Sequence, residues 1–293
     1  MRIAVLSRGP QLYSTQSLIR AGYQRRHSMR IIDHTRCVPV LGHGKPFIWY
    51  DGYRMERFDA VIPRIGASVT ATGATVINHF ELMNTYSVIR SEALLQSRDK
   101  LRCLQKLAQH GLPIPATAAI SDGAEMDYLV KTLGGFPIVI KLLESTHGMG
   151  VLLAENAQQL ESITEAFLRL GERLILQEFI RESEGTDIRV LVVAGEVVAS
   201  MKRQAQQGEF RSNLHRGGIG IPERLSEEEM DLAVKATSLM GLDVAGVDFL
   251  RSKKGPLILE VNASPGLEGI ETITGIDVAG KVIEMIERKG EIG

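Results

Sequence analysis

Strand and helix patterns alternate along the first third of the chain, and this alternation most constrains the fold. Short apolar segments at residues 3–6, 29–32 and 60–63 predict strands, while segments with helical periodicity at 14–26 and 73–82 predict helices. Strands that alternate with helices pair in parallel, because each helix returns the chain across the sheet. We therefore predict a small parallel α/β unit at the N-terminus.

The other expected elements complete this unit and form two further groups. A hairpin at 47–55 closes on Asp51-Gly52, a strong turn signal. The central group has helices at 100–110, 123–133 and 157–168 and strands at 116–120, 137–143, 151–154 and 174–179. The last group has a hairpin at 187–202, a helix at 227–240 with a capping box from Ser226 and Glu229, a second hairpin, and a helix at 277–289. We predict domains at 1–97, 98–182 and 183–293.

Composition limits the classes of function. The 293 residues carry a formal net charge of −1, so no basic field favours a direct nucleic-acid partner. No apolar run approaches the roughly 18 residues of a membrane span, so we expect no membrane partner. Cys37 and Cys103 lack the spacing of a metal or redox motif. We expect two reduced thiols and a cytoplasmic protein.

The second hairpin, near residues 246–262, carries three oxygen-bearing side chains. Asp248 lies on its first strand, and Glu260 and Asn262 lie two apart on its second, so these two point to the same face. Carboxylate and amide oxygens suit magnesium that carries phosphates. The alternative is a structural hairpin with surface carboxylates, which Glu260 weakens, because its strand is otherwise too apolar to bury a carboxylate without a partner.

Two features of the central group are suited to a nucleotide. Lys141 ends an apolar strand before a glycine-containing loop at 144–150, a setting that suits phosphate oxygens but matches no standard nucleotide fingerprint. A tight turn is the alternative interpretation. Glu178 and Phe179 end another apolar strand, where main-chain groups could bind adenine. Asp187 could reach a ribose, although a generic strand end and a solvated Asp remain open.

A basic segment follows at 201–218. It places five cationic or titratable groups close together, with little acidic compensation beyond Glu209: Lys202, Arg203, Arg211, His215 and Arg216. Such groups could neutralise a triphosphate and an anionic reacting group. The alternative is a solvated basic loop, but the Gly217-Gly218 pair and the nearby candidate metal site favour function.

These motifs together resemble the ATP-grasp superfamily, and specifically the RimK family. Lys141 with its loop, the Glu178-Phe179 strand end, R-S-N-L-H-R-G-G at 211–218 and E-V-N-A-S-P-G-L-E-G at 260–269 occur in the family's order. V-I-P-R-I-G at 61–66, R-D-K at 98–100 and the segment 269–281 extend the resemblance over nearly the whole chain. It implies an α/β fold, α+β in the C-terminal part, in which a small Rossmann-like pre-ATP-grasp domain precedes an ATP-grasp fold.

The resemblance also implies roles for individual residues. ATP would lie between the central and C-terminal units, and two Mg²⁺ or Mn²⁺ ions would be held by Asp248, Glu260 and Asn262. The implied nucleotide contacts are Lys100, Lys141, Glu178, Phe179, Asp187, Arg211, Ser212 and Asn213. Lys141, with Arg211 or Arg216, would act on the transferring group. Ser145, His147 and Lys202 depart from the family pattern, and the loop at 145–150 is the candidate lid.

The implied reaction joins a carboxylate to an amine. By resemblance, the chain would add L-glutamate to the C-terminus of small-subunit ribosomal protein S-six through an acyl phosphate, perform poly-glutamate synthesis as well, and form a homo-oligomer such as a tetramer. A related ligase acting on another carrier protein or a small molecule, of the lysine-biosynthesis, cofactor or glutathione type, is the first alternative. A nucleotide-binding regulator without catalysis is the second.

Overall fold

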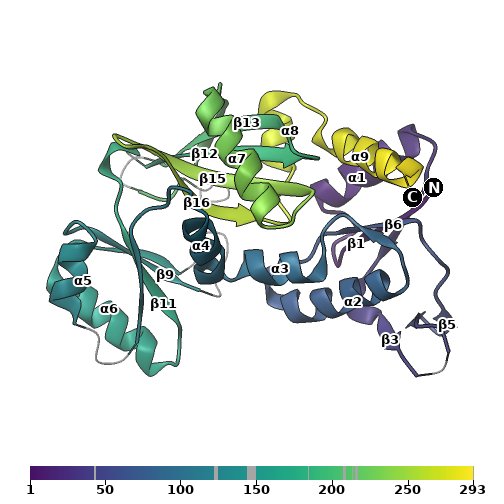
Figure 1. Ribbon diagram of the computed structural model, residues 1–293, viewed down its shortest axis with the longest axis horizontal. Helices are drawn as coiled ribbons and strands as arrows, with labels where there is room; N and C mark the ends of the chain where they lie inside the picture. Colours follow the sequence, from purple (N-terminus) through teal and green to yellow (C-terminus); the bar gives the residue numbers. More distant parts are fainter. Residues whose placement is uncertain are drawn as a thin grey trace.

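A computed structural model describes residues 1–42, 44–121, 125–143, 150–183, 185–206, 209–212, 214 and 217–292. The N-terminal unit lies at one end of the molecule and the central subdomain at the other, with a five-stranded sheet extending over the space between them (Figure 1). Within the described residues, no helix is long and apolar enough to cross a membrane.

The N-terminal unit contains the predicted parallel sheet. Its strand order is β2-β1-β6-β7, and all three pairings are parallel. The strands are β1 (Arg2–Leu6), β2 (Ser28–Ile32), β6 (Ala60–Pro63) and β7 (Tyr86–Ser87). The helices are α1 (Tyr13–Gln24) and α2 (Thr70–Leu82), with short 3-10 turns at His34–Arg36 and Ala67–Val69. The parallel α/β prediction is confirmed, and helix α2 begins three residues earlier than expected.

A small antiparallel sheet projects from this unit. It consists of β3 (Val38–Val40), β4 (Phe47–Tyr50) and β5 (Tyr53–Arg54). Asp51 and Gly52 have φ angles of 52° and 86°, as a two-residue hairpin turn requires. The predicted hairpin is confirmed, and β3 is an additional strand.

Two consecutive helices connect the N-terminal unit to the central subdomain. These are α3 (Ser91–Arg98), which was not predicted, and α4 (Lys100–Gln109). Asp99 caps α4 by accepting a hydrogen bond from Arg102 N at 3.0 Å. Arg98 and Lys100 therefore lie on either side of a helix start, where the three parts of the molecule meet.

The central subdomain is a four-stranded antiparallel sheet covered by two helices. The strand order is β10-β9-β11-β8, and the strands are β8 (Thr117–Ile120), β9 (Ile138–Leu142), β10 (Val151–Ala154) and β11 (Leu174–Glu178). The helices are α5 (Met126–Thr132) and α6 (Ala157–Arg169). The predicted turn between β9 and β10 lies outside the described residues, but Lys141 pairs with Val151 across it.

The C-terminal part forms the five-stranded antiparallel sheet with order β14-β13-β12-β15-β16. Its strands are β12 (Thr186–Val193), β13 (Glu196–Gln204), β14 (Ile219–Pro222), β15 (Val244–Ser252) and β16 (Gly255–Asn262), after a 3-10 turn at Arg181–Ser183. Its helices are α7 (Glu227–Leu239), α8 (Glu268–Thr274) and α9 (Val278–Ile292). The capping box of α7 is confirmed. Strand β14 and helix α8 were not predicted.

Two large hydrophobic cores lie on the two sides of the molecule, and a third, smaller cluster of Leu104, Leu143 and Ile175 joins helix α4 to the central sheet. One continuous core joins the N-terminal sheet to the C-terminal sheet and to helix α9, from Ile3 and Phe80 to Val247 and Ile286. The central subdomain has a core of its own around Ile140 and Leu176. The main pocket lies between the central sheet and the C-terminal sheet.

Candidate active site

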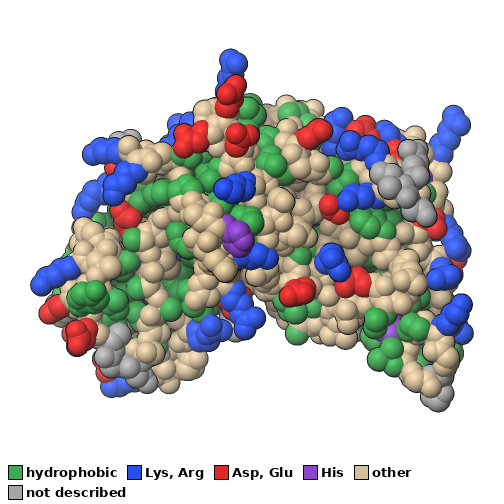
Figure 2. Space-filling model, viewed as in Figure 1, with side chains coloured by type: hydrophobic (Ala, Val, Ile, Leu, Met, Phe, Trp, Pro, Cys, Tyr) green, Lys and Arg blue, Asp and Glu red, His purple; other side chains and the backbone are tan. Residues whose placement is uncertain are grey.

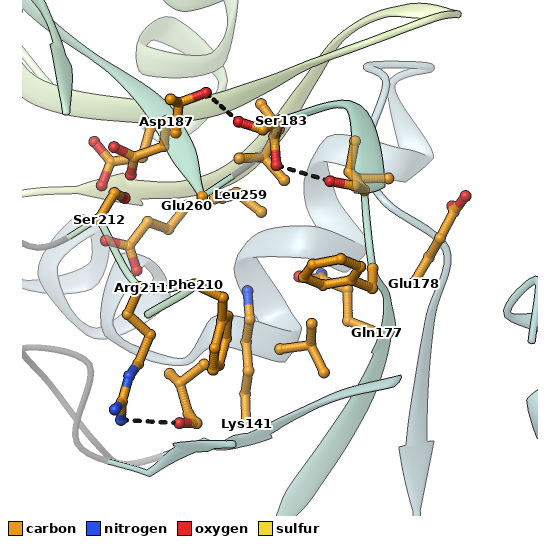
Figure 3. A pocket seen from close by; sticks show the side chains of 18 of the residues that line it. Lys141, Gln177, Glu178, Ser183, Asp187, Phe210, Arg211, Ser212, Leu259 and Glu260 are labelled. Atoms are coloured by element: carbon orange, nitrogen blue, oxygen red, sulfur yellow. Dashed lines mark hydrogen bonds between the residues drawn. The ribbon is translucent and has the colours of Figure 1, made fainter. Parts of the chain in front are cut away.

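The main pocket lies between the central sheet and the C-terminal sheet. Strands β9, β10 and β11 bound one side of it, and β12, β13, β15 and β16 bound the other. Its walls include most of the predicted nucleotide residues: Lys100, Lys141, Glu178, Phe179, Asp187, Arg211 and Ser212. Asp248 and Glu260 also line it (Figure 3). Residues predicted from scattered segments therefore line a single cavity.

Lys141 projects from β9 into the open middle of the pocket (Figure 3). Burial lowers the pKa of its ammonium to about 8, although the carboxylate of Glu260 counteracts part of this shift. Lys100 lies nearby and donates to the carbonyl oxygens of Leu142 and Leu143 at 3.2 and 3.1 Å. Burial also lowers the pKa of Lys100. Two cations placed in such surroundings favour a bound anion.

The end of β11 is arranged for main-chain contacts. The carboxylate of Glu178 is directed away from the middle of the pocket (Figure 3), and the Glu178 backbone N–H donates to Ala116 O at 2.9 Å. Because the Glu178 N–H already has an acceptor, a ligand at this strand end would have to bind main-chain groups of the residues that follow Glu178. Phe179 and Phe210 contribute apolar surface, with ring centroids 6.5 Å apart at an interplanar angle of 69°.

Asp187 and Asp248 belong to a buried ionic network with two arginines. Arg203 pairs with Asp187 and also donates to Asp248 Oδ2 at 2.8 Å. Arg189 Nε donates to Asp248 Oδ1 at 2.7 Å. Burial alone would raise the pKa of Asp248, but Arg189 and Arg203 lower it below its usual range. The solvated alternative for Asp187 is wrong, because only 6% of the residue is exposed.

The sequence interpretation did not single out Arg189. It lies on β12, directly across from Asp248 on β15, but 59 residues away in sequence. The only available signal was an inward-facing basic residue on a strand otherwise rich in valine. Such a residue requires a buried acidic partner, and the sequence does not identify that partner.

The predicted metal set is brought together on the β15–β16 hairpin. Asp248 and Glu260 are cross-strand partners, and Asn262 Nδ2 donates to Glu260 Oε1 at 2.8 Å. The prediction that Glu260 and Asn262 share a face is therefore confirmed. The side chain of Glu260 is 40% exposed. The carboxylate of Asp248, at 4% exposure, is the buried one.

The donor chemistry of this set fits a hard divalent cation. The bond from Asn262 Nδ2 leaves its carbonyl oxygen as an acceptor, and Glu260 is accessible from the pocket. Asp248 already accepts two hydrogen bonds from Arg189 and one from Arg203, so it retains limited capacity. Glu260 and Asn262 would therefore be the main ligands of a magnesium ion, and Asp248 would be a weaker ligand.

Arg211 and Ser212 also line the pocket. Arg211 forms a two-pronged ion pair with Glu209, with Nε–Oε1 and Nη2–Oε2 distances of 2.9 and 2.6 Å, and it lowers the pKa of Glu209 to about 2. Its guanidinium also donates to Val151 O at 3.3 Å. Ser212 is buried. Asn213, Arg216, His215, Ser145, His147 and the candidate lid lie outside the described residues.

An antiparallel central sheet facing a second antiparallel sheet across a cation-lined pocket defines an ATP-grasp protein. Residues 97–286 match the RimK-like ATP-grasp domain, and residues 1–94 match the RimK PreATP-grasp domain. The chain belongs to the RimK family and is an ATP-dependent ligase.

Relatives and solved structures agree with this assignment. A "Probable alpha-L-glutamate ligase" from Picosynechococcus sp. is 52% identical, covering 100% of this chain and 97% of the relative. A protein of the same name from Ectopseudomonas mendocina is 53% identical with the same coverage. The structure of the ATP-grasp ligase PsnB complexed with a phosphomimetic variant of its minimal precursor, Mg and ADP has a TM-score of 0.75 at 20% identity, with 98% of both chains covered. That likeness supports the fold.

Proposed function

We propose that this protein attaches L-glutamate to the C-terminal carboxylate of a protein acceptor, with small-subunit ribosomal protein S-six as the first candidate. The observation that supports this proposal most is that the ammonium group of Lys141 lies around the same pocket as the accessible carboxylate–amide pair of Glu260 and Asn262. The choice of glutamate follows the relatives, which are named alpha-L-glutamate ligases.

The proposed chemistry solves a leaving-group problem. A carboxylate does not condense with an amine in water, because hydroxide is a poor leaving group. Transfer of the γ-phosphoryl group of ATP to a carboxylate oxygen gives an acyl phosphate and ADP. The glutamate amino group then attacks the acyl carbon, the C–O bond to phosphate breaks, and the amine loses a proton. The products are an amide, ADP and phosphate.

The chain's own groups have defined tasks in this proposal. Lys141 binds phosphate oxygens and stabilises the charge that develops on them. Phe179 and Phe210 provide an apolar site for the base, and Arg211 exchanges part of its contact with Glu209 for phosphate. Two magnesium or manganese ions at Glu260, Asn262 and Asp248 would supply further charge neutralisation.

Mass spectrometry of candidate acceptors tests this function. We expect a mass increase of one or more glutamate residues on ribosomal protein S-six after incubation with ATP, Mg²⁺ and L-glutamate, and faster phosphate release with both substrates present. Replacing Glu260 with Gln should lower the rate by about 100-fold or more, because the main metal ligand is lost. An E260Q variant with the wild-type rate would contradict the assigned metal site.

A related ligase with another acceptor is the second candidate. The macrocyclase MdnC bound with its precursor peptide MdnA has the same fold, with a TM-score of 0.75 at 16% identity. Peptide acceptors therefore occur among proteins of this shape. A panel of peptides and small carboxylic acids, each scored by phosphate release with L-glutamate, separates the two candidates. Modification of only a small molecule would refute the protein acceptor.

A further inference from the structure

Four cationic side chains gather where the N-terminal unit meets the metal hairpin. Lys100 and Lys141 line the pocket, whereas Arg64 and Arg98 are not among its lining residues. Arg64 follows strand β6, and Arg98 ends helix α3. The space-filling view shows an indentation between the two lobes, with Lys and Arg side chains beside it (Figure 2).

The two arginines have only neutral hydrogen-bond partners in the described part of the chain. Arg64 Nη2 donates to Pro265 O at 2.7 Å, and Arg98 Nη2 donates to Ile65 O. The Arg98 Nε–H is buried and has no hydrogen-bond partner among the residues that the structure describes. A buried guanidinium donor without an acceptor is costly, so the position is better suited to a state with an anion present.

The local charge balance indicates that an anion would bind here. Burial, together with the smaller effect of the positive charge of Arg98, lowers the pKa of Arg64 to about 10. Burial also lowers the pKa of Arg98, with Glu260 opposing the shift. Glu260 is shared among Arg98, Lys100 and Lys141. The two lysines also have Asp99, Asp187 and Asp248 as acidic neighbours, whereas in the described part of the chain Glu260 alone acts on Arg98 and no carboxylate acts on Arg64. ATP phosphates would compensate the two lysines in the pocket, but they leave the arginines uncompensated.

The position of the arginines shows which end of the pocket they adjoin. Arg64 lies at the carboxyl end of a parallel strand, where open α/β sheets bind ligands. Its partner Pro265 is three residues beyond Asn262, and Arg98 donates to the carbonyl of Ile65, the residue after Arg64, so both arginines adjoin the metal end of the pocket rather than the Phe179 end. The negative charge of Glu260 also acts on Arg98. The phosphoryl group that reacts lies at that end in the proposed function.

We propose that Arg64 and Arg98 form a carboxylate-binding subsite for a ligation substrate. The inference rests on the proposed function and deepens it, because guanidinium groups bind carboxylates through paired N–H donors. The carboxylate is either that of the acceptor or the α-carboxylate of the incoming amino acid. Both sources share this chemistry, and the two arms of the experiment distinguish them.

Binding is measured by calorimetry on full-length protein loaded with AMPPNP and Mg²⁺, with L-glutamate in one arm and the dipeptide Glu-Glu in the other. The variants are R64Q, R98Q and R98K, and R102Q is the matched control, because Arg102 lies on helix α4 with a 74% exposed side chain. We expect R64Q and R98Q to lower the affinity for one of the two ligands by at least about tenfold, the effect expected when a charged hydrogen bond is lost. AMPPNP affinity should change less than about twofold in the same variants.

Each outcome of this experiment either assigns the Arg64–Arg98 subsite or contradicts it. Loss of L-glutamate binding assigns the subsite to the amino acid, and loss of the dipeptide assigns it to the acceptor. R98K should retain part of the affinity and serves if R98Q does not fold. The subsite would be refuted if the wild-type protein bound neither ligand, or if the variants kept the affinity for both. It would also be refuted if the variants lost affinity for Mg²⁺ and AMPPNP to the same extent. Arginine-dependent binding without any ligation would instead refute the proposed function alone.

Discussion

At the scale of single residues, Lys141 carries a charge that the fold disfavours. Its pKa falls from the model-peptide value of 10.5 to about 8 because of burial. Between these two values the unfolded chain binds more protons than the folded chain, so this group makes the free energy of unfolding rise with pH. Below about pH 8 the full penalty is present, on the order of 3 kcal/mol before any relaxation.

Replacing Lys141 with Met should therefore stabilise the ligand-free protein at pH 7 while weakening ATP binding. We expect a gain of about 1–3 kcal/mol in the free energy of unfolding, which shrinks as pH rises from 8 to 10.5. Urea unfolding at several pH values measures it, with Lys131→Met, an exposed lysine on α5, as the control. A destabilised K141M protein at pH 7 would contradict the sign of this argument.

At the scale of elements, Arg203 holds three strands together. It lies on β13 and bonds to Asp187 on β12 and Asp248 on β15. Replacing Arg203 with Met leaves two buried carboxylates short of a partner, so we expect a loss of about 3–5 kcal/mol in the free energy of unfolding. Chemical denaturation measures it. Lys202→Met, one residue earlier on the same strand, should cost less than about 1 kcal/mol, and an equal loss in both variants would count against the network.

The elements also separate what the sequence could predict from what it could not. The β4–β5 turn at Asp51-Gly52 and the capping box of α7 depend on neighbouring residues, so local patterns identify them. Helices α3 and α8 have eight and seven residues, too few for a clear helical period. Strand β14 is recognisable mainly by its pairing with β13, which is a tertiary contact.

The same division holds for the candidate site. Asp248, Glu260 and Asn262 could be predicted because they share one hairpin, whose strand spacing determines which side chains meet. Arg189 and the Arg64–Pro265 contact could not be predicted, because they join segments 59 and 201 residues apart. The exposure of Glu260 could not be predicted either, since the pocket beside β16 is bounded by the central subdomain, which is distant in sequence.

At the scale of the whole molecule, the two large cores group the parts of the chain, while the three predicted domains stay a prediction. The N-terminal unit and the C-terminal sheet share one core. Polar contacts reinforce it, including Ser17 Oγ to Glu271 Oε2 at 2.8 Å and Tyr86 OH to Asp243 Oδ2 at 2.6 Å. The central subdomain, with its own core, contacts the rest largely around the pocket. Apart from the pocket, the small cluster of Leu104, Leu143 and Ile175 also joins the central sheet to helix α4, so ligand binding would strengthen a limited contact between two units with largely separate cores.

Hydrogen exchange read by mass spectrometry tests this division. We expect strands β8–β11 to open as one unit, and the N-terminal and C-terminal sheets to open together as another. Ile286→Ala in α9 should accelerate exchange in both of these sheets and spare the central one, because Ile286 is fully buried in the shared core and its truncation costs about 2–5 kcal/mol. Leu176→Ala, equally buried in the central core, should do the reverse. AMPPNP with Mg²⁺ should slow exchange in the central sheet most, and an I286A effect confined to the C-terminal sheet would show that the N-terminal unit folds on its own.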